Sequence, residues 1–184
     1  MTHQPAATTP AWVLSAVSYD SPDARRLTQA LHREQLATYG FADDPAGTPP
    51  GEFGPQHGTF LVASAGGPAI ACCGWRAAGP GTAEVKRLYV DPSARGQGLA
   101  RHLMEALEQH ARRCGKTRLI LETGARSHAA LALFTSCGFT FTGSYVEGRN
   151  PDVNRAMQKT LSPSAARQPE QAARATSAAW PAAR

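Results

Sequence analysis

Arg95-Gly96-Gln97-Gly98-Leu99-Ala100 is the stretch of this sequence that decides its fold, because it joins two segments of different periodicity. Before it, Thr82 to Val90 is rich in β-branched and aromatic residues, which favours a strand. After it, Leu99 to Cys114 carries apolar residues at helical spacing, and Gly115 follows as a helix terminator. The sequence therefore predicts a glycine-rich turn between a strand and a long helix.

The start of this helix has the properties of an anion-binding site. No Ser, Thr, Asp or Asn stands at its first position, so no side chain is available to bind the first helical amides. Gly96 and Gly98 would let an outside group approach the backbone closely. A diphosphate would satisfy these amides and gain from the helix dipole, while Arg95 and Arg101 add positive charge. A tight turn capped by water explains the glycine spacing equally well.

Two other phosphate-binding turns fit the segment less well. A P-loop is excluded because no Gly-Lys-Ser/Thr follows the glycines. The dinucleotide-binding fingerprint is a closer rival, since Gly96 and Gly98 follow a strand and Glu122 ends the next strand. However, Arg101 occupies the place of its third glycine, and the chain offers only one strand-helix-strand crossover.

The rest of the chain supplies the other elements of an α+β domain. Ser21 and Pro22 predict the start of a first helix that ends at Gly40, and Ser127 is expected to cap a shorter helix that ends at Gly138. The loop Asp43–Gly58 holds four prolines and four glycines. Further strands are expected at residues 12–17, 60–63, 69–75, 118–122, 139–145 and 155–161. The expected order is β-α-β-β-β-α-β-α-β-β, a mixed sheet of about seven strands with about three to four helices.

The length of 184 residues, 42% of them hydrophobic, suits one compact domain, which we place at residues 11–161. Residues 1–10 and 162–184 are polar and low in large apolar side chains, so we expect disordered tails, with Trp180 as the exception. We find no secretory leader and no run of ~18 apolar residues, which predicts a cytoplasmic protein without a membrane partner.

The charge and the cysteines exclude several classes of function. The formal charge of +5 falls to +3 without the last 23 residues, and no Lys/Arg block is interleaved with aromatic residues. This mild excess suits a phosphate-bearing small molecule and argues against a nucleic-acid partner. The four cysteines show no C-x-x-C spacing and no cluster with histidine. We therefore expect no metal site and no disulfide framework.

The segments around the glycine-rich turn resemble a known family. Glu84-Val85-Lys86-Arg87-Leu88-Tyr89-Val90-Asp91-Pro92 followed by Arg95–Ala100 is similar to the strand and pyrophosphate loop of the GNAT superfamily of acyl-CoA-dependent N-acyltransferases, in which the loop reads Gln/Arg-x-x-Gly-x-Gly/Ala. Later motifs of small bacterial members recur in the same order. They are Leu121-Glu122-Thr123-Gly124, Ala130-Leu131-Ala132-Leu133-Phe134, Cys137-Gly138-Phe139 and Met157-Gln158-Lys159-Thr160-Leu161.

The resemblance implies an N-acetyltransferase with acetyl-CoA as cosubstrate and a primary amine as acceptor. It implies a splayed sheet that opens between the strands ending at Val90 and Glu122. Backbone groups of Leu88, Tyr89 and Val90 would face the pantetheine arm and the thioester. Residues Arg95, Gly96, Gln97, Gly98, Leu99, Ala100 and Arg101 would bind the pyrophosphate, and the helix that carries Phe134 would line the other side.

Acetyl transfer requires that the amine attack the thioester and lose a proton. By the resemblance, Glu84 matches the position of a general base; by itself, a glutamate beside Lys86 and Arg87 is more often an ion-pair partner. His57 is the alternative base. Tyr145 stands where the family often has an aromatic residue near the acceptor, and ordinary strand packing is its alternative role.

The chain departs from the family where a Tyr often protonates the departing thiolate, because Phe134 has no proton to donate. Water, Tyr145, Ser136 or Cys137 could replace this group, or the acid step could matter little. An idle acyl-CoA-binding or regulatory domain is the alternative function class.

The acceptor is set by segments that differ from the family pattern. Asp43, Asp44 and Glu52 could attract a cationic amine, or they could simply be solvated loop acids. We expect a small-molecule amine first and a protein N-terminus or lysine second. The chain is expected to act as a monomer or a homodimer.

Overall fold

Seven strands form one mixed sheet in the computed structural model, which describes residues 12–162. The expected tails lie outside the described residues, apart from Ser162. Along the sheet the strand order is β1-β2-β3-β4-β5-β7-β6, and the pair β4–β5 is parallel while the other neighbouring pairs are antiparallel. The strands are β1 (Val13–Ala16), β2 (Gly58–Ser64), β3 (Ala71–Ala77), β4 (Thr82–Val90), β5 (Arg118–Gly124), β6 (Thr140–Thr142) and β7 (Asn154–Thr160).

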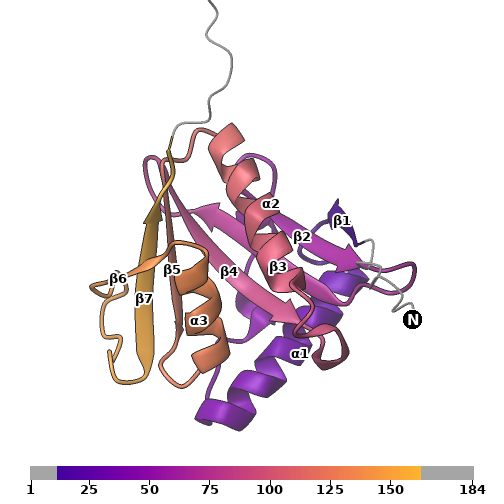
Figure 1. The fold of residues 1–184 in the computed structure, drawn as a ribbon, viewed down its shortest axis with the longest axis horizontal. Helices are drawn as coiled ribbons and strands as arrows, with labels where there is room; N and C mark the ends of the chain where they lie inside the picture. The colour runs from indigo at the N-terminus through magenta and orange to yellow at the C-terminus, as the bar shows by residue number, and fades with distance from the viewer. Residues whose placement is uncertain (1–11, 163–184) are drawn as a thin grey trace, which may run out of the picture.

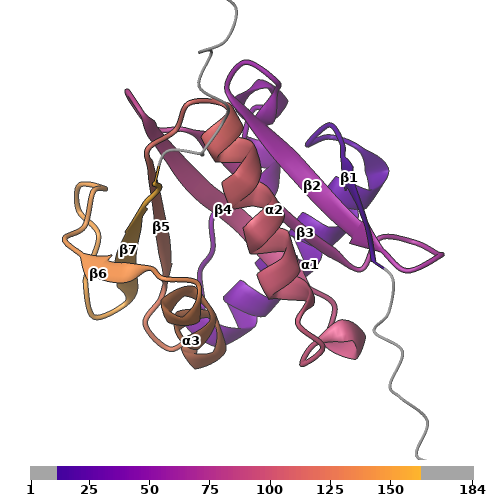
Figure 2. The ribbon, with the colours of Figure 1, turned by 45° about the horizontal axis from the view of Figure 1, so that its top comes forward.

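Helices cover both faces of this sheet, as Figures 1 and 2 show. Helix α1 (Pro22–Tyr39) lies behind the sheet in both views. Helices α2 (Leu99–Arg113) and α3 (His128–Ser136) lie on the opposite face, α2 across β2–β4 and α3 beside β5. The predicted mixed sheet of about seven strands with three to four helices is confirmed.

Local sequence signals account for most helix ends. The amide of Ala24 donates to the Ser21 hydroxyl over 3.4 Å, and Pro22 occupies the first turn of α1. Gly40, in the left-handed region with φ 80°, ends the same helix. The predicted start and end of α1 are therefore confirmed.

Each face of the sheet has its own hydrophobic core. The apolar stripe of α2, including Leu103 and Leu107, packs on one face together with Trp75 and Met157. Truncating a fully buried leucine such as Leu107 to alanine is expected to cost about 2–5 kcal/mol. On the other face α1 packs over a smaller core of aromatic and aliphatic side chains. Its buried members are Tyr19, Ala24, Leu27, Phe53, Phe60, Val62, Ala69, Cys72 and Tyr89.

Three local expectations need correction. The loop Asp43–Gly58 is not wholly irregular, because it contains two short 3-10 helices whose Phe53 is buried against Tyr19. The strand expected at residues 139–145 covers only β6, so Tyr145 lies in the following loop. There the Ser144 hydroxyl bonds the backbone of Val146 and competes with the strand ladder.

The third correction concerns Ser127, which stands at the N-cap of α3 without capping it. None of the first amides of α3 donates to its hydroxyl. The Ser127 hydroxyl instead lies 2.8 Å from the hydroxyl of Tyr39, a residue of α1. A tertiary partner has therefore replaced the local one.

Candidate active site

Strands β4 and β5 separate partway along their length and leave a cleft between them. They pair only between Thr82–Glu84 and Arg118–Ile120. Beyond that point the two strands diverge, as Figure 1 shows. A cavity of about 1030 Å³ opens between them and is bordered by α1, α3 and the start of α2. The splay that the family resemblance implied is therefore confirmed.

An irregularity in β4 shapes one wall of this cleft. Cys72 pairs with Tyr89 and Gly74 with Lys86, so two residues of β4, Arg87 and Leu88, stand opposite one residue of β3. Such a bulge bends and re-aims a strand. Arg87 carries the bend with a φ of 61°, the only non-glycine residue in the described chain with positive φ. A non-glycine residue held there stores backbone strain.

After the bulge, β4 directs backbone polar groups toward the cleft. The amide of Asp91 donates to the carbonyl of Ile70 over 2.8 Å, which fixes the alternation of the antiparallel ladder. By that alternation the amides and carbonyls of Val90 and Leu88 point away from β3, toward the side where β5 has diverged. The carbonyl of Val90 indeed accepts a bond from Nε of Arg95.

The start of α2 forms one end of the cleft, and it is built from backbone. Gly98 is the N-cap with φ 89° and offers no side-chain cap, as expected from the sequence. Gly96 also has positive φ, and a Cβ on either glycine would meet open space. The amides of the first helical turn therefore face an open region at the positive end of the helix dipole.

Both arginines of this turn have protein partners. Arg95 forms an ion pair with Glu34 of α1 at 2.6 Å, so its charge is partly neutralised. Arg101 donates to the Ser136 hydroxyl over 2.8 Å and ties the start of α2 to the end of α3. Gln97 does not line the cleft, since its amide nitrogen lies near the carbonyl of Ser93. The other proposed cofactor residues of this turn, and Leu88, Tyr89, Val90 and Phe134, do line it.

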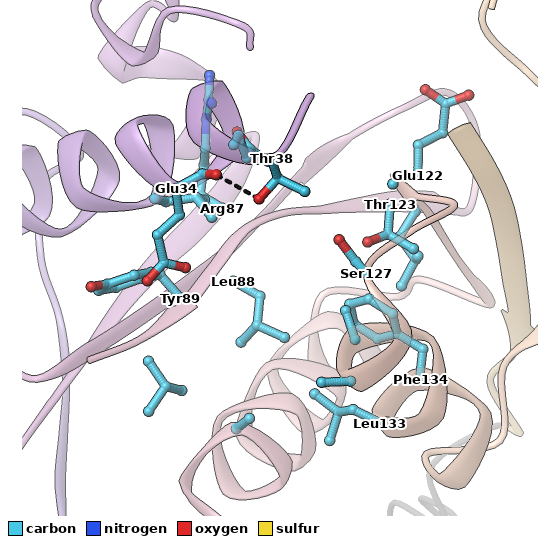
Figure 3. A pocket seen from close by; sticks show the side chains of 18 of the residues that line it. Glu34, Thr38, Arg87, Leu88, Tyr89, Glu122, Thr123, Ser127, Leu133 and Phe134 are labelled. Atoms are coloured by element: carbon cyan, nitrogen blue, oxygen red, sulfur yellow. Dashed lines mark hydrogen bonds between the residues drawn. The ribbon is translucent and has the colours of Figure 1, made fainter. Parts of the chain in front are cut away.

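Helix α3 forms the opposite, apolar wall. Figure 3 shows Leu133 and Phe134 on this helix, facing Leu88 across the opening. Phe134 is buried and meets Phe139 edge-on at 5.9 Å between ring centroids. The wall can therefore bury an apolar chain, but its aromatic side chain has no proton to give.

Glu84 lies beside the cleft and belongs to a buried ion-pair network. Its side chain is only 6% exposed, and Arg76 and Lys86 approach its carboxylate at 2.7 and 3.4 Å. Arg76 also pairs with Glu52. Burial raises the pKa of Glu84, but the charge of Lys86 and the hydrogen bond and charge of Arg76 outweigh it, so the pKa is lowered. Glu84 is thus ionised at neutral pH.

The two residues predicted to be catalytic are in contact. The hydroxyl of Tyr145 donates to Oε1 of Glu84 over 3.0 Å, although the chain separates them by 61 residues. Burial and the nearby Glu84 charge raise the pKa of Tyr145. Neither residue lines the main cleft; Glu84 and His57 instead border a second hollow of about 600 Å³. The next two residues of β4, Val85 and Lys86, do line the main cleft.

A chain of charges crosses the far end of the cleft from the start of α2. Arg149, in the loop before β7, lies 3.3 Å from Asp43 and 3.3 Å from Glu122. Arg87 also donates to the carbonyl of Asp43. In Figure 3, Arg87 and Glu122 both project away from the apolar wall formed by Phe134. We call Asp43, Arg149 and Glu122 the charged bridge.

The loop acids that could have attracted a cationic amine are engaged in other contacts. Asp44 accepts from the amide of Ala46 and caps a 3-10 helix. Glu52 pairs with Arg76, and Asp43 belongs to the charged bridge. These residues therefore do not form a free acidic patch.

Sequence reasoning missed the contribution of α1 to the cleft. Leu31, Glu34, Gln35, Thr38 and Tyr39 line it from this helix. Only the amphipathic pattern of α1 is visible in the sequence, and that pattern does not show which part of its surface lies over the splay. Ser127 and Arg149 were missed as well, because their partners are distant in the sequence. Ser127 contacts Tyr39, 88 residues away, and Arg149 contacts Asp43, 106 residues away.

No group of three or more His, Cys, Asp or Glu side chains within residues 12–162 is placed to hold a metal ion. No helix among the same residues is long and apolar enough to span a membrane.

Known proteins match this chain over most of its described length. The family model for the acetyltransferase (GNAT) family matches residues 24–139. An uncharacterized N-acetyltransferase of Schizosaccharomyces pombe is 35% identical over 138 residues, which is 73% of this chain and 85% of the relative.

Solved structures agree with this match. A Klebsiella pneumoniae protein assigned as an acyl-CoA N-acyltransferase has a TM-score of 0.70 at 30% identity, covering 82% of this chain and 97% of its own. A Salmonella typhimurium protein assigned as an acetyltransferase, solved with its cofactor acetyl-CoA, has a TM-score of 0.64 at 23% identity and covers 85% and 97%. The family match, the close relative and the splayed sheet lead to one conclusion: this chain belongs to the acetyltransferase (GNAT) family and is an acetyltransferase.

Proposed function

We propose that this enzyme transfers the acetyl group of acetyl-CoA to a primary amine of a small molecule, by direct attack within a ternary complex. The GNAT family uses acetyl-CoA, and the Salmonella typhimurium neighbour was solved with it. The substrate and the residues that act on it are the content of the proposal.

The observation that carries the proposal is the uncapped start of α2 at one end of the cleft. Its first amides have no side-chain partner, and Gly96 and Gly98 leave open space beside them. A diphosphate fits such a site because its oxygens accept from several amides at once and its charge is favoured by the helix dipole. Arg101, held by Ser136, would add charge at the rim.

The apolar middle of the cleft fits the pantetheine arm. Leu88 and Val90 turn backbone polar groups toward the opening, while Leu133 and Phe134 cover the other side. An amide from this part of β4 would donate to the thioester oxygen as it gains negative charge, which stabilises the tetrahedral intermediate. We propose that the acetyl group therefore lies near Leu88 to Val90.

We propose that Glu84 accepts the proton of the amine through a water molecule. A water is needed because Glu84 itself does not line the cleft. The lowered pKa keeps Glu84 ionised, so it attracts an ammonium group, and Tyr145 orients the carboxylate through its hydrogen bond. An alkylamine with a pKa near ~10 must lose its proton before it can attack.

The charged bridge favours a small-molecule acceptor over a protein acceptor. Arg149 links a loop after α1 to β5 and so crosses the end of the cleft away from the diphosphate site. An extended peptide needs an open groove or a free sheet edge at the reacting group. A closed end of this kind leaves room for a compact amine more readily than for a polypeptide.

The proposal is tested by binding and then by turnover. Millimolar acetyl-CoA should raise the melting temperature, because a ligand that binds only the native state stabilises it. A panel of L-methionine sulfone, L-phenylalanine, β-phenylethylamine, spermidine and short peptides would then be incubated with acetyl-CoA and followed by mass spectrometry. Acetylation of a small amine over the peptides supports the proposal. No melting shift with acetyl-CoA, or acetylation of peptides alone, contradicts it.

A further inference from the structure

The reaction leaves a thiolate, and the apolar wall opposite Leu88 offers it no proton. When the thioester carbon–sulfur bond breaks, the bonding electrons move to sulfur, and Phe134 cannot protonate it. Within residues 12–162, the cleft is lined by six hydroxyl-bearing residues: Thr38, Tyr39, Tyr89, Thr123, Ser127 and Ser136. A phenol with a pKa near ~10 is a far better acid than an aliphatic alcohol. The two tyrosines are therefore the first candidates.

The two tyrosines lie at different places. Tyr89 is buried in the core beneath α1, and the guanidinium of Arg95 lies 5.7 Å from its ring, at the diphosphate end. Tyr39 is the last residue of α1, and its hydroxyl lies 2.8 Å from the hydroxyl of Ser127 at the start of α3. Figure 3 shows Ser127 at the start of α3, on the side of the opening across from Leu88. Of the two, only Tyr39 is joined to the wall opposite β4.

Ser127 is free to pass a proton from Tyr39 into the cleft. Its own amide donates to the carbonyl of Gly124, and its hydroxyl caps none of the first amides of α3. A serine hydroxyl can accept one hydrogen bond and donate another at the same time. With Tyr39 as the donor, the hydroxyl hydrogen of Ser127 is available to a group inside the cleft.

Besides Ser127, two residues hold Tyr39 in position. A side chain at Gly124 would overlap the Tyr39 hydroxyl, so Tyr39 can keep this position only beside a glycine. The guanidinium of Arg126 lies 5.0 Å from the centroid of the Tyr39 ring and donates to the carbonyl of Thr38. These contacts join the end of α1 to the turn between β5 and α3.

The other candidates for a proton donor have different partners. Tyr145 directs its hydroxyl at Glu84, and Ser136 donates to the carbonyl of Leu133 while it accepts from Arg101. Cys137 does not line the cleft, and burial raises the pKa of its thiol. Tyr39 with Ser127 is the remaining pair of donors that lines the cleft.

We propose that Tyr39 and Ser127 form a proton relay to the departing CoA thiolate, an inference that rests on the proposed function. As the carbon–sulfur bond breaks, sulfur takes the hydrogen of the Ser127 hydroxyl, and the serine oxygen takes the hydrogen of the Tyr39 phenol. The products are free CoA thiol and a Tyr39 phenolate, which regains a proton from solvent. Ser127 is the catalytic residue that touches sulfur, and Tyr39 supplies it.

The test measures thiol release from acetyl-CoA with the amine of the panel that turns over fastest, and in water without an amine. Tyr39→Phe keeps the ring against Gly124 and Arg126 and removes only the hydroxyl. Ser127→Ala removes the intermediate oxygen. Each change should lower kcat about 10- to 100-fold, toward the lower end for acid catalysis because a thiolate is a fair leaving group. The double variant should be no slower than the slower single variant, since the two act as a unit.

Two further measurements separate the relay from a structural contact. The shift in melting temperature with acetyl-CoA should equal that of the parent. The solvent deuterium isotope effect on kcat should fall in both single variants. Tyr19→Phe, which removes a tyrosine hydroxyl that does not line the cleft and donates to the Pro45 carbonyl, is the matched control and should change kcat less than about twofold.

Several outcomes would overturn the relay. One is a kcat within about twofold of the parent for either single variant, and another is a loss of acetyl-CoA affinity with kcat unchanged. If the parent turns over and the relay variants have the same kcat as the parent, the proposed function stands and the relay fails. If the parent releases no thiol with any amine or in water, the proposed function fails and the relay with it.

Discussion

The two ends of the cleft are formed by different kinds of chemical group. At the start of α2 the binding groups are backbone amides released by Gly96 and Gly98, and no side chain caps them. At the other end the groups are side chains in ion pairs: Arg149 lies between Asp43 and Glu122 in the cleft, and Glu84 lies between Arg76 and Lys86 beside it. Backbone amides suit a ligand part that never varies, whereas side chains can be exchanged to fit different acceptors.

This difference predicts that the ends can be disabled separately. A change at the acceptor end should reduce turnover and leave acetyl-CoA binding unchanged. A change at the diphosphate end should abolish acetyl-CoA binding, and this loss should not depend on which amine is the acceptor. The following variants test this separation, in order of decreasing expected effect.

The largest effect is expected for Glu84→Gln. Glutamine keeps the size of the side chain and can still bond Tyr145, but it cannot accept the proton of the amine. Turnover at neutral pH should fall ~100-fold or more, as is typical when a general base is removed, while the acetyl-CoA melting shift is retained. Steady-state kinetics with the best amine of the panel, together with a thermal melt, measure both.

Two parallel variants make this result specific. His57→Gln and Glu122→Gln remove the alternative bases, one in the second hollow and one in the charged bridge. If Glu84→Gln stays within a few-fold of the parent while one of these falls ~100-fold, the base has been wrongly assigned. A collapse of the melting temperature in Glu84→Gln would make its ion pairs structural.

At the diphosphate end, Gly98→Val should abolish the melting shift with acetyl-CoA. A side chain there would enter the open space beside the α2 amides that we assign to the diphosphate. The residue would also be strained, because φ is 89°. Gly66→Val, in the turn between β2 and β3 with φ 81° and equally open surroundings, controls for that strain. Both variants should lose stability alike, but Gly66→Val should keep the shift. An equal acetyl-CoA shift in both variants would contradict the assignment.

How well each end of the cleft could be predicted from the sequence depends on whether backbone amides or distant side chains form it. The diphosphate end depends on local signals, namely Gly96, Gly98 and the absence of a cap residue, which all lie within one short segment. The strands and helices were predictable for the same reason, since periodicity and caps such as Ser21 act over a few residues. Local interactions can be inferred without knowledge of the tertiary structure.

The acceptor end could not be predicted in this way. Tyr39 meets Ser127, Tyr145 meets Glu84 and Arg149 meets Asp43 across 88, 61 and 106 residues. The family resemblance marked Glu84 and Tyr145 separately, but it did not show that they touch or that both lie outside the cleft lining. Ser127 was misread as a cap because its local environment favours one, and the tertiary contact with Tyr39 prevailed.

A smaller effect is expected for Arg149→Gln, which breaks the charged bridge. The KM for the amine should rise several-fold because the end of the cleft loses its cross-link, while the acetyl-CoA shift stays unchanged. Larger amines should be accepted relatively better. Arg155→Gln, whose guanidinium bonds the Pro151 carbonyl in the same loop, is the control and should leave KM within about twofold. Equal KM values for parent and Arg149→Gln would show that the bridge does not border the acceptor site.

The smallest effect concerns the pH dependence of stability at Glu84. Its folded pKa lies below the ordinary value of 4.5, because Lys86 and Arg76 outweigh the cost of burial. A carboxylate with a lowered folded pKa stabilises the native state above its unfolded pKa, and this contribution is lost as the pH falls through the folded value. The difference in unfolding free energy between the parent and Glu84→Gln should therefore be constant from pH 7 to about 5 and shrink below 4.5, because a protonated glutamate resembles glutamine. Urea unfolding at pH 7, 5, 4 and 3 measures it. Glu147→Gln, at an exposed residue without an ion pair within residues 12–162, should show a flat difference near zero. If the difference for Glu84→Gln does not change with pH, the ion pairs of Arg76 and Lys86 do not stabilise the charged form, and Glu84 would be a stronger base than its surroundings imply.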